Sequence, residues 1–323
     1  MILAGDIGGT KTKLAHVSQR DGIWRLEDVK SYESQRYDSL ESVIEAYLGA
    51  VQARADCACF GVAGPVLGGE ATVTNLPWRM SEAGLRARLG IAHVHLINDL
   101  TALAYAVPVL QATDVTVLQR GVPDAAGAIA ILAPGTGLGE GYLCWDGTRY
   151  RPGASEGGHA DFAPADPLQV QLLEYLWTEL GHVSWERVLS GPGLLTIYRF
   201  LKARGAAEPA WVAERLALGD PSAAISALAL DGAEPLCTQA LELFVSMLGA
   251  QAGNMALTLM ATGGVYLGGG IPPKILPRLQ DGTFLRAFLA KGRLSHVVQR
   301  TPVYVIQNSD AQLLGAAACA SEL

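Results

Sequence analysis

The segment that decides the fold is residues 5–12, which read GDIGGTKT and follow the apolar opening Met1–Ala4. The apolar residues predict a buried strand that ends at Asp6, and the glycines predict a turn into a second strand, Thr12–Val17. Consecutive backbone N–H groups in such a turn can cradle phosphate oxygens, and Thr10 adds a hydroxyl donor. The same letters are also typical of an ordinary hairpin turn with Asp as its turn residue, so both interpretations stay open on this segment alone.

A second predicted strand, His93–Ile97, delivers Asn98 and Asp99 side by side at its end. A helix is expected to start at Leu100, and Asn and Asp are preferred helix caps, so capping is one interpretation. The other makes Asp99 a general base for a hydroxyl that attacks a phosphoryl group, a role worth about 10²–10⁴ in rate. For the same reaction, the carboxylate of Asp6 could hold a magnesium ion through water.

A third element is the run APGTGLG at residues 133–139, which follows the strand Ala128–Leu132. It partly matches the dinucleotide-binding fingerprint, but Gly141–Trp145 is typical of a strand, so the helix that such a site requires is missing. No GKS or GKT tripeptide of a P-loop occurs. The segment therefore predicts either a second phosphate-binding turn or a plain hairpin. Two glycine turns and a strand-end carboxylate together suit phosphoryl transfer to a hydroxyl.

Three more side chains are candidates for binding a small polar ligand. Glu156 and His159 flank two glycines, so both can converge on one ligand, although an irregular surface loop is the alternative. A metal site would need a third ligand of credible spacing, and none is evident. Glu186 follows a tryptophan and precedes a helix start, where a solvated carboxylate is also common.

Composition narrows the classes of function. The chain has 323 residues, half of them hydrophobic, which is enough for two domains and a cleft between them. A net charge of −7 without a basic tract argues against a nucleic-acid partner. No apolar run reaches the ~18 residues of a membrane span. Because the first strand starts at Ile2, we expect no signal peptide and a cytoplasmic protein.

Strands and helices alternate along the rest of the chain, with a faint internal duplication that begins again near Ala128. Further strands are expected at Ile23–Lys30, Cys57–Val62, Ala71–Thr74, Gly264–Leu267 and Val303–Ile306. Helices are expected from Ser39 to Leu48 and at Ser81–Leu89, Leu100–Val107, Pro167–Leu180, Pro192–Ala203, Pro209–Leu218 and Glu234–Met260, with a last one from Asp310. The domain boundary should fall near Pro108–Thr113, and the last helix should cross back to the first domain.

Taken together, these segments resemble the bacterial glucokinase family of the hexokinase, actin and Hsp70 superfamily. The resemblance runs from residues 5–10 to residues 309–316, which read SDAQLLGA. Its most specific pieces are NDLTA at 98–102, APGTGLG at 133–139, EGGHADF at 156–162 and LSGPGL at 189–194. A related branch, the ROK kinases and repressors, holds a structural zinc with clustered cysteines. That cluster is missing here, so the resemblance implies the zinc-free branch and no structural zinc.

The resemblance implies an α/β protein with a two-domain, actin-like ATPase (ribonuclease H-like) fold and a central cleft. The small domain would comprise residues 1–110 plus 308–323, and the large domain residues 111–307. The implied activity is that of a glucokinase, which transfers the γ-phosphoryl group of ATP to O6 of D-glucose with the assistance of Mg²⁺. Homodimers are usual in the family. Kinases of other hexoses, a sugar-responsive regulator and an ATPase acting on proteins are the alternatives.

The resemblance also implies a role for each candidate residue. The residues that bind glucose would be Asn98, Asp99, Glu156, His159 and Glu186, with Asp99 also the general base for O6. Asp6 would lie near magnesium and the transferred phosphate. The residues that contact ATP would be Asp6, Gly8, Gly9, Thr10, Lys11, Gly135, Thr136, Gly137, Gly268, Gly269 and Gly270, the last three beside the adenosine. One departure is Glu140, where the family has small or apolar residues, so we expect its carboxylate to point away from the triphosphate.

Overall fold

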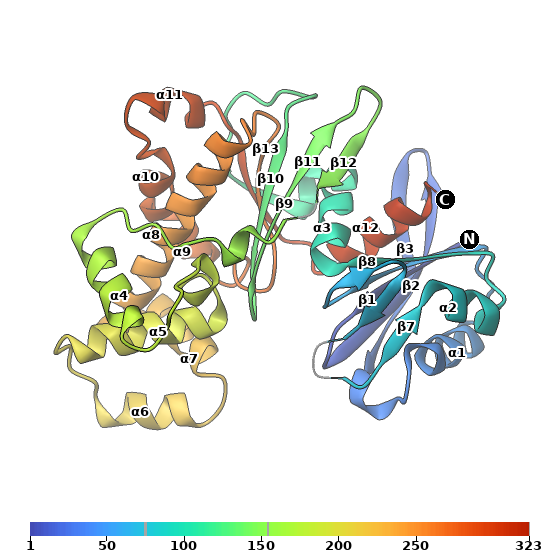
Figure 1. The fold of residues 1–323 in the computed structure, drawn as a ribbon, viewed down its shortest axis with the longest axis horizontal. Coiled ribbons are helices and arrows are strands. Elements are labelled where there is room, and N and C mark those ends of the chain that lie inside the picture. Colours follow the sequence, from blue (N-terminus) through green and yellow to red (C-terminus); the bar gives the residue numbers. More distant parts are fainter. Residues whose placement is uncertain (74–75, 154, 323) are drawn as a thin grey trace. The chain divides into compact units, whose positions relative to one another are not determined.

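The computed structural model describes residues 1–73, 76–153 and 155–322. The chain forms two compact units, whose elements are labelled in Figure 1. The first unit contains residues 1–114, 150–152 and 308–323, and the second contains residues 115–149 and 153–307. Thr74, the last residue of the expected strand Ala71–Thr74, lies outside the described residues.

The first unit is built on a sheet with the strand order β3-β2-β1-β4-β8. Its strands are β1 Ile2–Ile7, β2 Lys11–Arg20, β3 Ile23–Glu33, β4 Cys57–Val62 and β8 His93–Asn98. β1, β2 and β3 form an antiparallel meander, whereas β1, β4 and β8 run parallel. Parallel strands point the same way, so the carboxyl ends of β1, β4 and β8 share one edge of the sheet. Residues that follow β1 and β8 therefore meet at that edge.

Helices cover both faces of this sheet. They are α1 Leu40–Val51, α2 Glu82–Leu89, α3 Asp99–Ala106 and α12 Ala311–Ala320. Side chains alternate along each strand, so Leu3 and Phe60 pack with α1 and α2, while Ala4 and Cys59 pack with α3 and α12. The small residues of the second face let α3 and α12 approach the sheet closely. Asp6 has the same parity as Ala4 and belongs to that second face.

Shorter elements complete the first unit. The strands are β5 Val66–Leu67, β6 Glu70–Thr72 and β7 Arg79–Ser81, and the 3₁₀ turns are η1 Ser34–Arg36, η2 Val107–Val109 and η3 Ala112–Asp114. Ser39 caps α1, because its Oγ accepts a hydrogen bond from the N–H of Ser42 at 3.3 Å. Ser81 caps α2 in the same way, from the N–H of Gly84 at 3.0 Å.

The second unit is built on a mixed sheet with the order β12-β11-β10-β13-β14-β9. Its strands are β9 Val115–Gln119, β10 Ile129–Pro134, β11 Leu138–Trp145, β12 Tyr150–Gly153, β13 Gly264–Leu267 and β14 Val303–Ile306. β10, β13 and β14 run parallel, and β11 and β9 are antiparallel to their neighbours β10 and β14.

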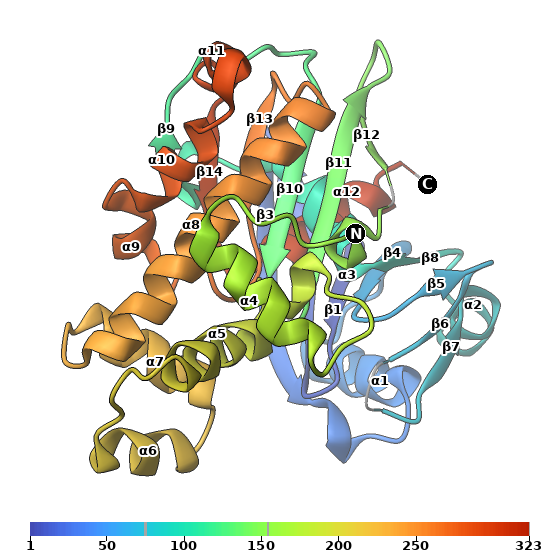
Figure 2. The ribbon, with the colours of Figure 1, turned by 60° about the vertical axis from the view of Figure 1, so that its left-hand side comes forward.

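Helix α8 is the centre of the second unit and runs along one face of this sheet (Figure 2). The helices are α4 Pro167–Trp177, α5 Gly191–Ala203, α6 Ala210–Ala217, α7 Pro221–Leu230, α8 Pro235–Thr258, α9 Leu276–Gln280, α10 Thr283–Leu289 and α11 Ser295–Val298. The 3₁₀ turns are η4 Gly157–His159, η5 Trp185–Arg187 and η6 Gly292–Leu294. None of the described helices has the length and apolar composition that a membrane crossing requires.

The sequence pattern located most of these elements. The strands Cys57–Val62, Gly264–Leu267 and Val303–Ile306 have the expected bounds. The pattern did not predict α7, α9, α10, α11, β5, β7, β9 or β12, and all of these except the ten-residue α7 have seven residues or fewer. Strand β11 starts at Leu138 rather than at the expected Gly141, so the glycine run is half turn and half strand.

Replacing Gly315 by alanine should destabilise the protein. Gly315 lies where α12 crosses α3, and a Cβ atom there would lie 1.7 Å from the carbonyl oxygen of Ala102. The helices must move apart, which should lower the free energy of unfolding by about 2 kcal/mol or more. The midpoint of urea unfolding, followed by circular dichroism, measures the change.

Gly49→Ala in α1 is the matched control. Nothing lies within 4 Å of a Cβ atom at Gly49, and the position is exposed in a helix. Alanine is the better helix former by about 0.5–1 kcal/mol, so this variant should be more stable. Equal effects of the two substitutions would show that the close crossing at Gly315 is not what limits stability.

Candidate active site

Asp6 and Asp99 lie at the shared carboxyl edge of the first unit's parallel strands. Asp6 pairs in register with Gly61 of β4, and Gly61 pairs with Ile97 of β8. A Cβ atom at Gly61 would lie 2.9 Å from Cβ of Ala102 and 3.7 Å from Cα of Asp99. The glycine therefore lets the first turn of α3, which carries Asp99, lie directly against the strand beside Asp6.

Asn98 and Asp99 begin helix α3, as the capping interpretation predicts. Oδ1 of Asn98 accepts a hydrogen bond from the N–H of Leu100 at 2.9 Å, and its amide nitrogen donates to the carbonyl oxygen of Gly64 at 3.1 Å. Oδ1 of Asp99 accepts from the same N–H of Leu100 at 2.9 Å. The backbone thus fixes the orientation of both side chains. Capping and catalysis do not exclude each other here, because the cap uses one oxygen of the Asp99 carboxylate.

Three carboxylates of the first unit, those of Asp6, Asp99 and Asp310, interact electrostatically. Burial raises the pKa of Asp6 to about 6, and the charges of Asp99 and Asp310 act in the same direction. Lys13 opposes the rise in the pKa of Asp6, and its Nζ donates to Oδ1 of Asp310 at 2.7 Å. Burial also raises the pKa of Asp99. This edge therefore carries more negative charge than Lys13 neutralises.

This excess of negative charge suits a magnesium ion. Mg²⁺ prefers oxygen ligands and keeps several of its waters, so one or two carboxylates are enough to hold it. In the described part of the chain, no group of three His, Cys, Asp or Glu side chains makes a complete metal site. The residues present therefore fit a hydrated ion held through Asp6, and do not fit a metal with a full set of protein ligands.

The turn between β1 and β2 is a hairpin braced by η1. The N–H of Gly8 donates to the carbonyl oxygen of Lys11 at 3.0 Å. Oγ of Ser34 donates to the carbonyl oxygen of Gly8 at 2.8 Å. Gly9 is partly exposed, and Thr10 and Lys11 are exposed. The hairpin interpretation is thus confirmed, except that Asp6 is a residue of β1 paired with Lys13 and not a turn residue. Phosphate binding by the same turn stays a prediction.

The second glycine turn, between β10 and β11, is closed by residues from two other segments. The N–H of Gly135 donates to the carbonyl oxygen of Gly137, and the N–H of Gly191 donates to that of Gly135, both at 2.8 Å. Oε2 of Glu186 accepts from the N–H of Leu138 at 2.9 Å. A Cβ atom at Gly137 would lie 2.5 Å from this oxygen. Glycine at this position leaves the space that the carboxylate of Glu186 occupies, and a larger residue would displace this carboxylate.

Glu156 and His159 flank the two glycines of the turn η4, which lies against the start of β11; Glu156 precedes the turn and His159 is its last residue. The N–H of His159 donates to the carbonyl oxygen of Glu156 at 2.9 Å and closes the turn. A Cβ atom at Gly158 would lie 2.0 Å from the carbonyl oxygen of Leu138, so this glycine permits the close approach. Both flanking side chains are exposed.

Glu186 lies in the segment next to η4. The N–H of Trp185 donates to the carbonyl oxygen of Ala160 at 3.0 Å, and residues 161 and 184 form an antiparallel bridge. Residues 156–162 and 183–188 therefore lie side by side in the second unit. The structure brings the segments of all three predicted sugar-binding residues of this unit together at the start of β11.

Glu140, the departure from the family pattern, is buried inside the second unit. Both of its carboxylate oxygens accept from the amide nitrogen of Gln251 in α8, at 2.9 and 3.1 Å. A Cβ atom at Gly157 would lie 2.6 Å from Oε2 of Glu140. Burial raises the pKa of Glu140. The carboxylate thus lies between α8 and the first residue of η4.

A cavity of about 670 Å³ lies beside the glycine turn of the second unit. Three residues predicted to contact ATP, Gly135, Thr136 and Gly270, line it. Gly269 has a φ of 78°, and a Cβ atom there would lie 2.7 Å from the carbonyl oxygen of Pro134. Gly269 therefore passes close to the end of β10 in a conformation that favours glycine.

Sequence reasoning missed the polar residues of this cavity, Asp220, Ser222 and Lys274. Oγ of Ser222 donates to the carbonyl oxygen of Gly191 at 2.6 Å, which ties α7 to α5. Asp220 followed by Pro221 was the available signal, because it is a helix cap with Pro in the first turn. The alanine-rich sequence of α7 lacks the alternation of apolar and polar residues with helical spacing, so the pattern did not indicate a helix there.

The comparisons with known proteins agree with this geometry. The family model Glucokinase matches residues 3–323. The glucokinase of Nostoc punctiforme (strain ATCC 29133 / PCC 73102) is 41% identical over 342 residues, which covers 100% of this chain and 99% of that protein. The crystal structure of a glucokinase from an Antarctic psychrotroph superposes with a TM-score of 0.90 at 33% identity, covering 100% and 99% of the two chains.

A more distant structure shows how widely the fold is shared. The ROK family glucokinase from Streptomyces griseus, solved with glucose and AMPPNP, has a TM-score of 0.67 at 22% identity and covers 100% and 99% of the two chains. The fold and the paired glycine turns define the class as kinases with the two-domain, actin-like ATPase fold, which confirms the predicted α/β fold class. Within that class, the chain belongs to the glucokinase family.

Replacing Asp6 by asparagine should stabilise the protein at neutral pH without divalent cations. A carboxyl whose pKa is higher in the folded state weakens the fold as the pH rises, here between 3.8 and about 6. The gain in the free energy of unfolding should reach about 1–3 kcal/mol at pH 7 and vanish near pH 3. Urea unfolding in EDTA at both pH values measures it.

Asp21→Asn, at an exposed position in the turn between β2 and β3, is the control. It should change stability by no more than about 0.5 kcal/mol at either pH. A gain from Asp6→Asn that is equally large at pH 3 and pH 7 would contradict the electrostatic explanation.

Proposed function

We propose that this protein transfers the γ-phosphoryl group of ATP to O6 of D-glucose and so forms glucose 6-phosphate. The observation that carries the proposal is Asp99, a partly buried carboxylate of fixed orientation at the end of β8. It lies in a chain that belongs to the glucokinase family over nearly its full length. Phosphoryl transfer to a sugar hydroxyl needs such a base close to a carboxylate that favours magnesium.

Asp99 acts as the general base. Burial raises its pKa, and a base whose pKa lies nearer the working pH accepts a proton more readily in the transition state. The N–H of Leu100 holds one oxygen of the carboxylate, which leaves the other to accept the proton of O6. As the proton moves from O6 to Asp99, O6 attacks the γ-phosphorus in line, the bond from this phosphorus to the oxygen that bridges the β- and γ-phosphates breaks, and ADP leaves.

The sugar hydroxyls are bound by Asn98 and Asp99 of the first unit and by Glu156, His159 and Glu186 of the second. Amide, imidazole and carboxylate groups can each hold one or two hydroxyls, and sites built this way reject analogues that lack the hydroxyl. Glu186 is fixed by the N–H of Leu138, so its position is set before any sugar arrives. Glu156 and His159 are exposed and free of that constraint.

ATP is the proposed phosphoryl donor, and the two glycine turns contact its phosphates. Gly8, Gly9, Thr10 and Lys11 form one turn, and Gly135, Thr136 and Gly137 form the other. Gly268, Gly269 and Gly270 border the adenosine. The support is the cavity of about 670 Å³, which combines predicted phosphate-binding residues with apolar walls of the kind that a purine requires. The Streptomyces griseus structure holds AMPPNP, but its likeness to this chain extends to the fold alone.

Magnesium would be held through water by Asp6. When bound, it neutralises charge on the phosphates and helps to orient them. Asp6 itself keeps the ion near the transferred group, and Lys13 limits the repulsion among the surrounding carboxylates.

The organisation of the protein is also part of the proposal. We propose that the two domains are residues 1–110 with 308–323 and residues 111–307. The compact units that the chain forms have similar bounds, which supports the division. We further propose that the protein is a cytoplasmic homodimer, as the resemblance to the family implies.

A coupled assay for glucose 6-phosphate tests the activity. Purified protein, magnesium-ATP and glucose should give rapid turnover, and mannose, fructose and N-acetylglucosamine should give at least about tenfold lower kcat/KM. If another sugar gave a higher kcat/KM than glucose, that sugar would be assigned as the substrate in place of glucose. Replacing ATP by ADP or polyphosphate tests the donor in the same assay.

Asp99→Asn should lower kcat by about 10² or more and leave glucose affinity within about tenfold of the native value. Asparagine keeps the shape and the cap acceptor but cannot accept the proton. Glucose binding by calorimetry and kcat from the coupled assay separate the two effects, with Asp21→Asn as the control. Near-normal turnover of Asp99→Asn would remove Asp99 from the role of base.

A further inference from the structure

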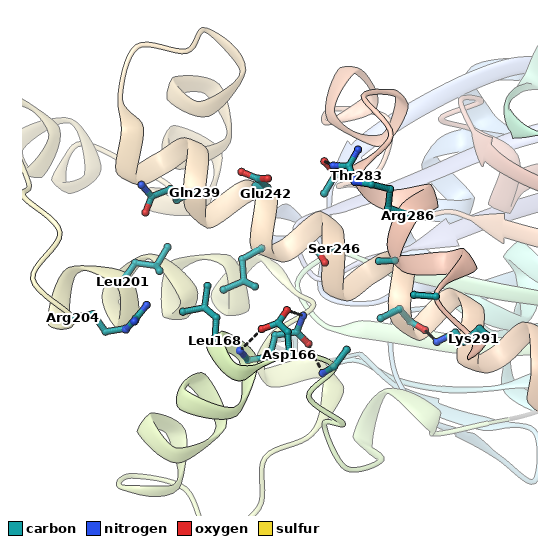
Figure 3. Close-up of a pocket in the computed structure, with 16 residues that line it drawn as sticks. Asp166, Leu168, Leu201, Arg204, Gln239, Glu242, Ser246, Thr283, Arg286 and Lys291 are labelled. Carbon is teal, nitrogen blue, oxygen red and sulfur yellow. Dashed lines mark hydrogen bonds between the residues drawn. The ribbon is translucent and has the colours of Figure 1, made fainter. Parts of the chain in front are cut away.

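A second cavity, of about 660 Å³, lies in the second unit between α8, α10 and the start of α4 (Figure 3). None of the predicted sugar- or ATP-binding residues is among those that line it. Leu168 and Leu243 give it apolar walls, and charged side chains lie at its two ends. In Figure 3, Arg286 and Lys291 lie toward one end and Arg204 toward the other.

Lys291 brings a half-buried positive charge to this cavity. Its Nζ donates to Oδ1 of Asn254 at 2.6 Å and to the carbonyl oxygen of Ala250 at 2.8 Å. Both acceptors are neutral, and no carboxylate in the described part of the chain pairs with Lys291. An ammonium group has three donors, so one is left for a ligand. Burial lowers the pKa of Lys291, as expected for a charge without a counter-ion.

The position of Lys291 is built into the packing of α8. A Cβ atom at Gly253 would lie 2.5 Å from Cε of Lys291, so α8 has a gap in which the lysine stem lies. A lysine held in this way loses little conformational freedom when it binds an anion.

Arg286 adds a second positive charge on α10. Its Nη2 donates to Oγ1 of Thr283 at 2.9 Å, and among the described residues no carboxylate pairs with it. Asp166, the acid at the start of α4, is already engaged by the N–H and the amide nitrogen of Gln169, at 2.9 and 2.7 Å. Asp166 keeps its negative charge, but among the described residues it forms no ion pair with Arg286 or Lys291.

Groups that suit hydroxyls line the rest of the cavity. Ser246, Gln239 and Glu242 lie along α8 and line the cavity between the charged ends. Hydroxyl, amide and carboxylate groups bind the hydroxyls of a polyol, whereas the two cations bind a phosphate. The volume is in the range of cavities that hold small metabolites.

A partly buried chain of hydrogen bonds connects Lys291 to the loop of Glu156 and His159. Lys291 donates to Asn254, the amide nitrogen of Asn254 donates to Oε1 of Gln251 at 3.1 Å, and Gln251 donates to Glu140. Glu140 in turn lies against Gly157, the first residue of η4. All members of the chain belong to the second unit. A ligand bound to Lys291 therefore also restrains Glu140, the side chain that lies against η4.

We propose that this cavity binds a small phosphate ester that carries hydroxyl groups, and that its binding strengthens glucose binding through the chain from Lys291 to Glu140. The binding of the anion is inferred from the residues that line the cavity. The coupling to glucose additionally rests on the proposed function of Glu156 and His159. Coupling between two sites is reciprocal, so glucose must strengthen binding of the anion by the same factor.

Isothermal calorimetry with glycerol 3-phosphate, inorganic phosphate and glycerol tests the binding. The ester should bind with a dissociation constant below about 1 mM, inorganic phosphate more weakly, and glycerol not detectably. Absence of binding by the ester overturns the proposal. Equal affinities of ester and inorganic phosphate overturn the assignment of the hydroxyl-binding groups. The titration does not depend on production of glucose 6-phosphate. It therefore decides whether the cavity binds the ester even if the proposed activity fails.

Variants locate the binding. Arg286→Gln, at an exposed position, and Lys291→Met should each weaken binding of glycerol 3-phosphate by about tenfold or more. Arg293→Gln removes an exposed charge two residues beyond Lys291, outside the cavity, and should bind as the native protein does. Native affinity in Arg286→Gln overturns the site even where Lys291→Met fails to fold.

The coupling is measured by repeating the titration with saturating glucose. Affinity for glycerol 3-phosphate should rise at least about twofold, and Asn254→Ala, which interrupts the chain, should bind the anion but lose the rise. If the native protein binds glucose but its affinity for glycerol 3-phosphate is the same with and without glucose, the coupling is overturned. A rise that survives in Asn254→Ala overturns the assigned path.

Discussion

Parallel pairing of β1, β4 and β8 places the carboxylates of Asp6 and Asp99 at one edge of the first unit, where they repel each other in partly buried surroundings. Burial, and to a smaller extent the repulsion from Asp99, raises the pKa of Asp6 to about 6, so the charged form of Asp6 is unfavourable at this edge without a ligand. Lys13 offsets part of the repulsion. A cation or a hydroxyl proton at this edge offsets the rest, so ligand binding relieves a strain that the fold itself creates. This edge of the sheet is therefore less stable alone than with a ligand that balances its charge, as is common for sites whose groups have perturbed pKa values.

Several glycines of this protein allow a neighbouring helix, strand or side chain to approach the backbone closely. Gly61, Gly137 and Gly158 all have φ values outside the left-handed region, yet a Cβ atom at each would collide with a neighbouring atom. At Gly61 the neighbour is α3, at Gly137 it is the carboxylate of Glu186, and at Gly158 it is the start of β11. Each close approach brings a predicted site residue toward a strand end. The glycine-rich motifs thus determine where functional side chains lie, in addition to any contact with phosphate.

Local pattern was enough to locate the strands at Cys57–Val62 and Val303–Ile306, because apolar runs bounded by polar residues need no knowledge of the partner strand. It also identified the cap of α3 at Asn98, and the family. It could not show that Glu186 accepts from the N–H of Leu138, since that contact joins residues far apart in the chain. The helix α7 was missed for a related reason. Its alanine-rich sequence has no clear polar face, so only the cap at Asp220 marks it. The functions of the site residues remain predictions.

The crossing of α12 over α3 has a consequence for synthesis. Residues 311–320 cover one face of the sheet formed by residues 2–98, but the ribosome makes them after the whole second unit. At about 5–20 residues per second, the roughly 200 intervening residues take about 10–40 s. During this time Ala4, Cys59 and their neighbours have no covering helix from α12. The unit that emerges first is therefore completed last, and its uncovered apolar face is where chaperones should bind the nascent chain.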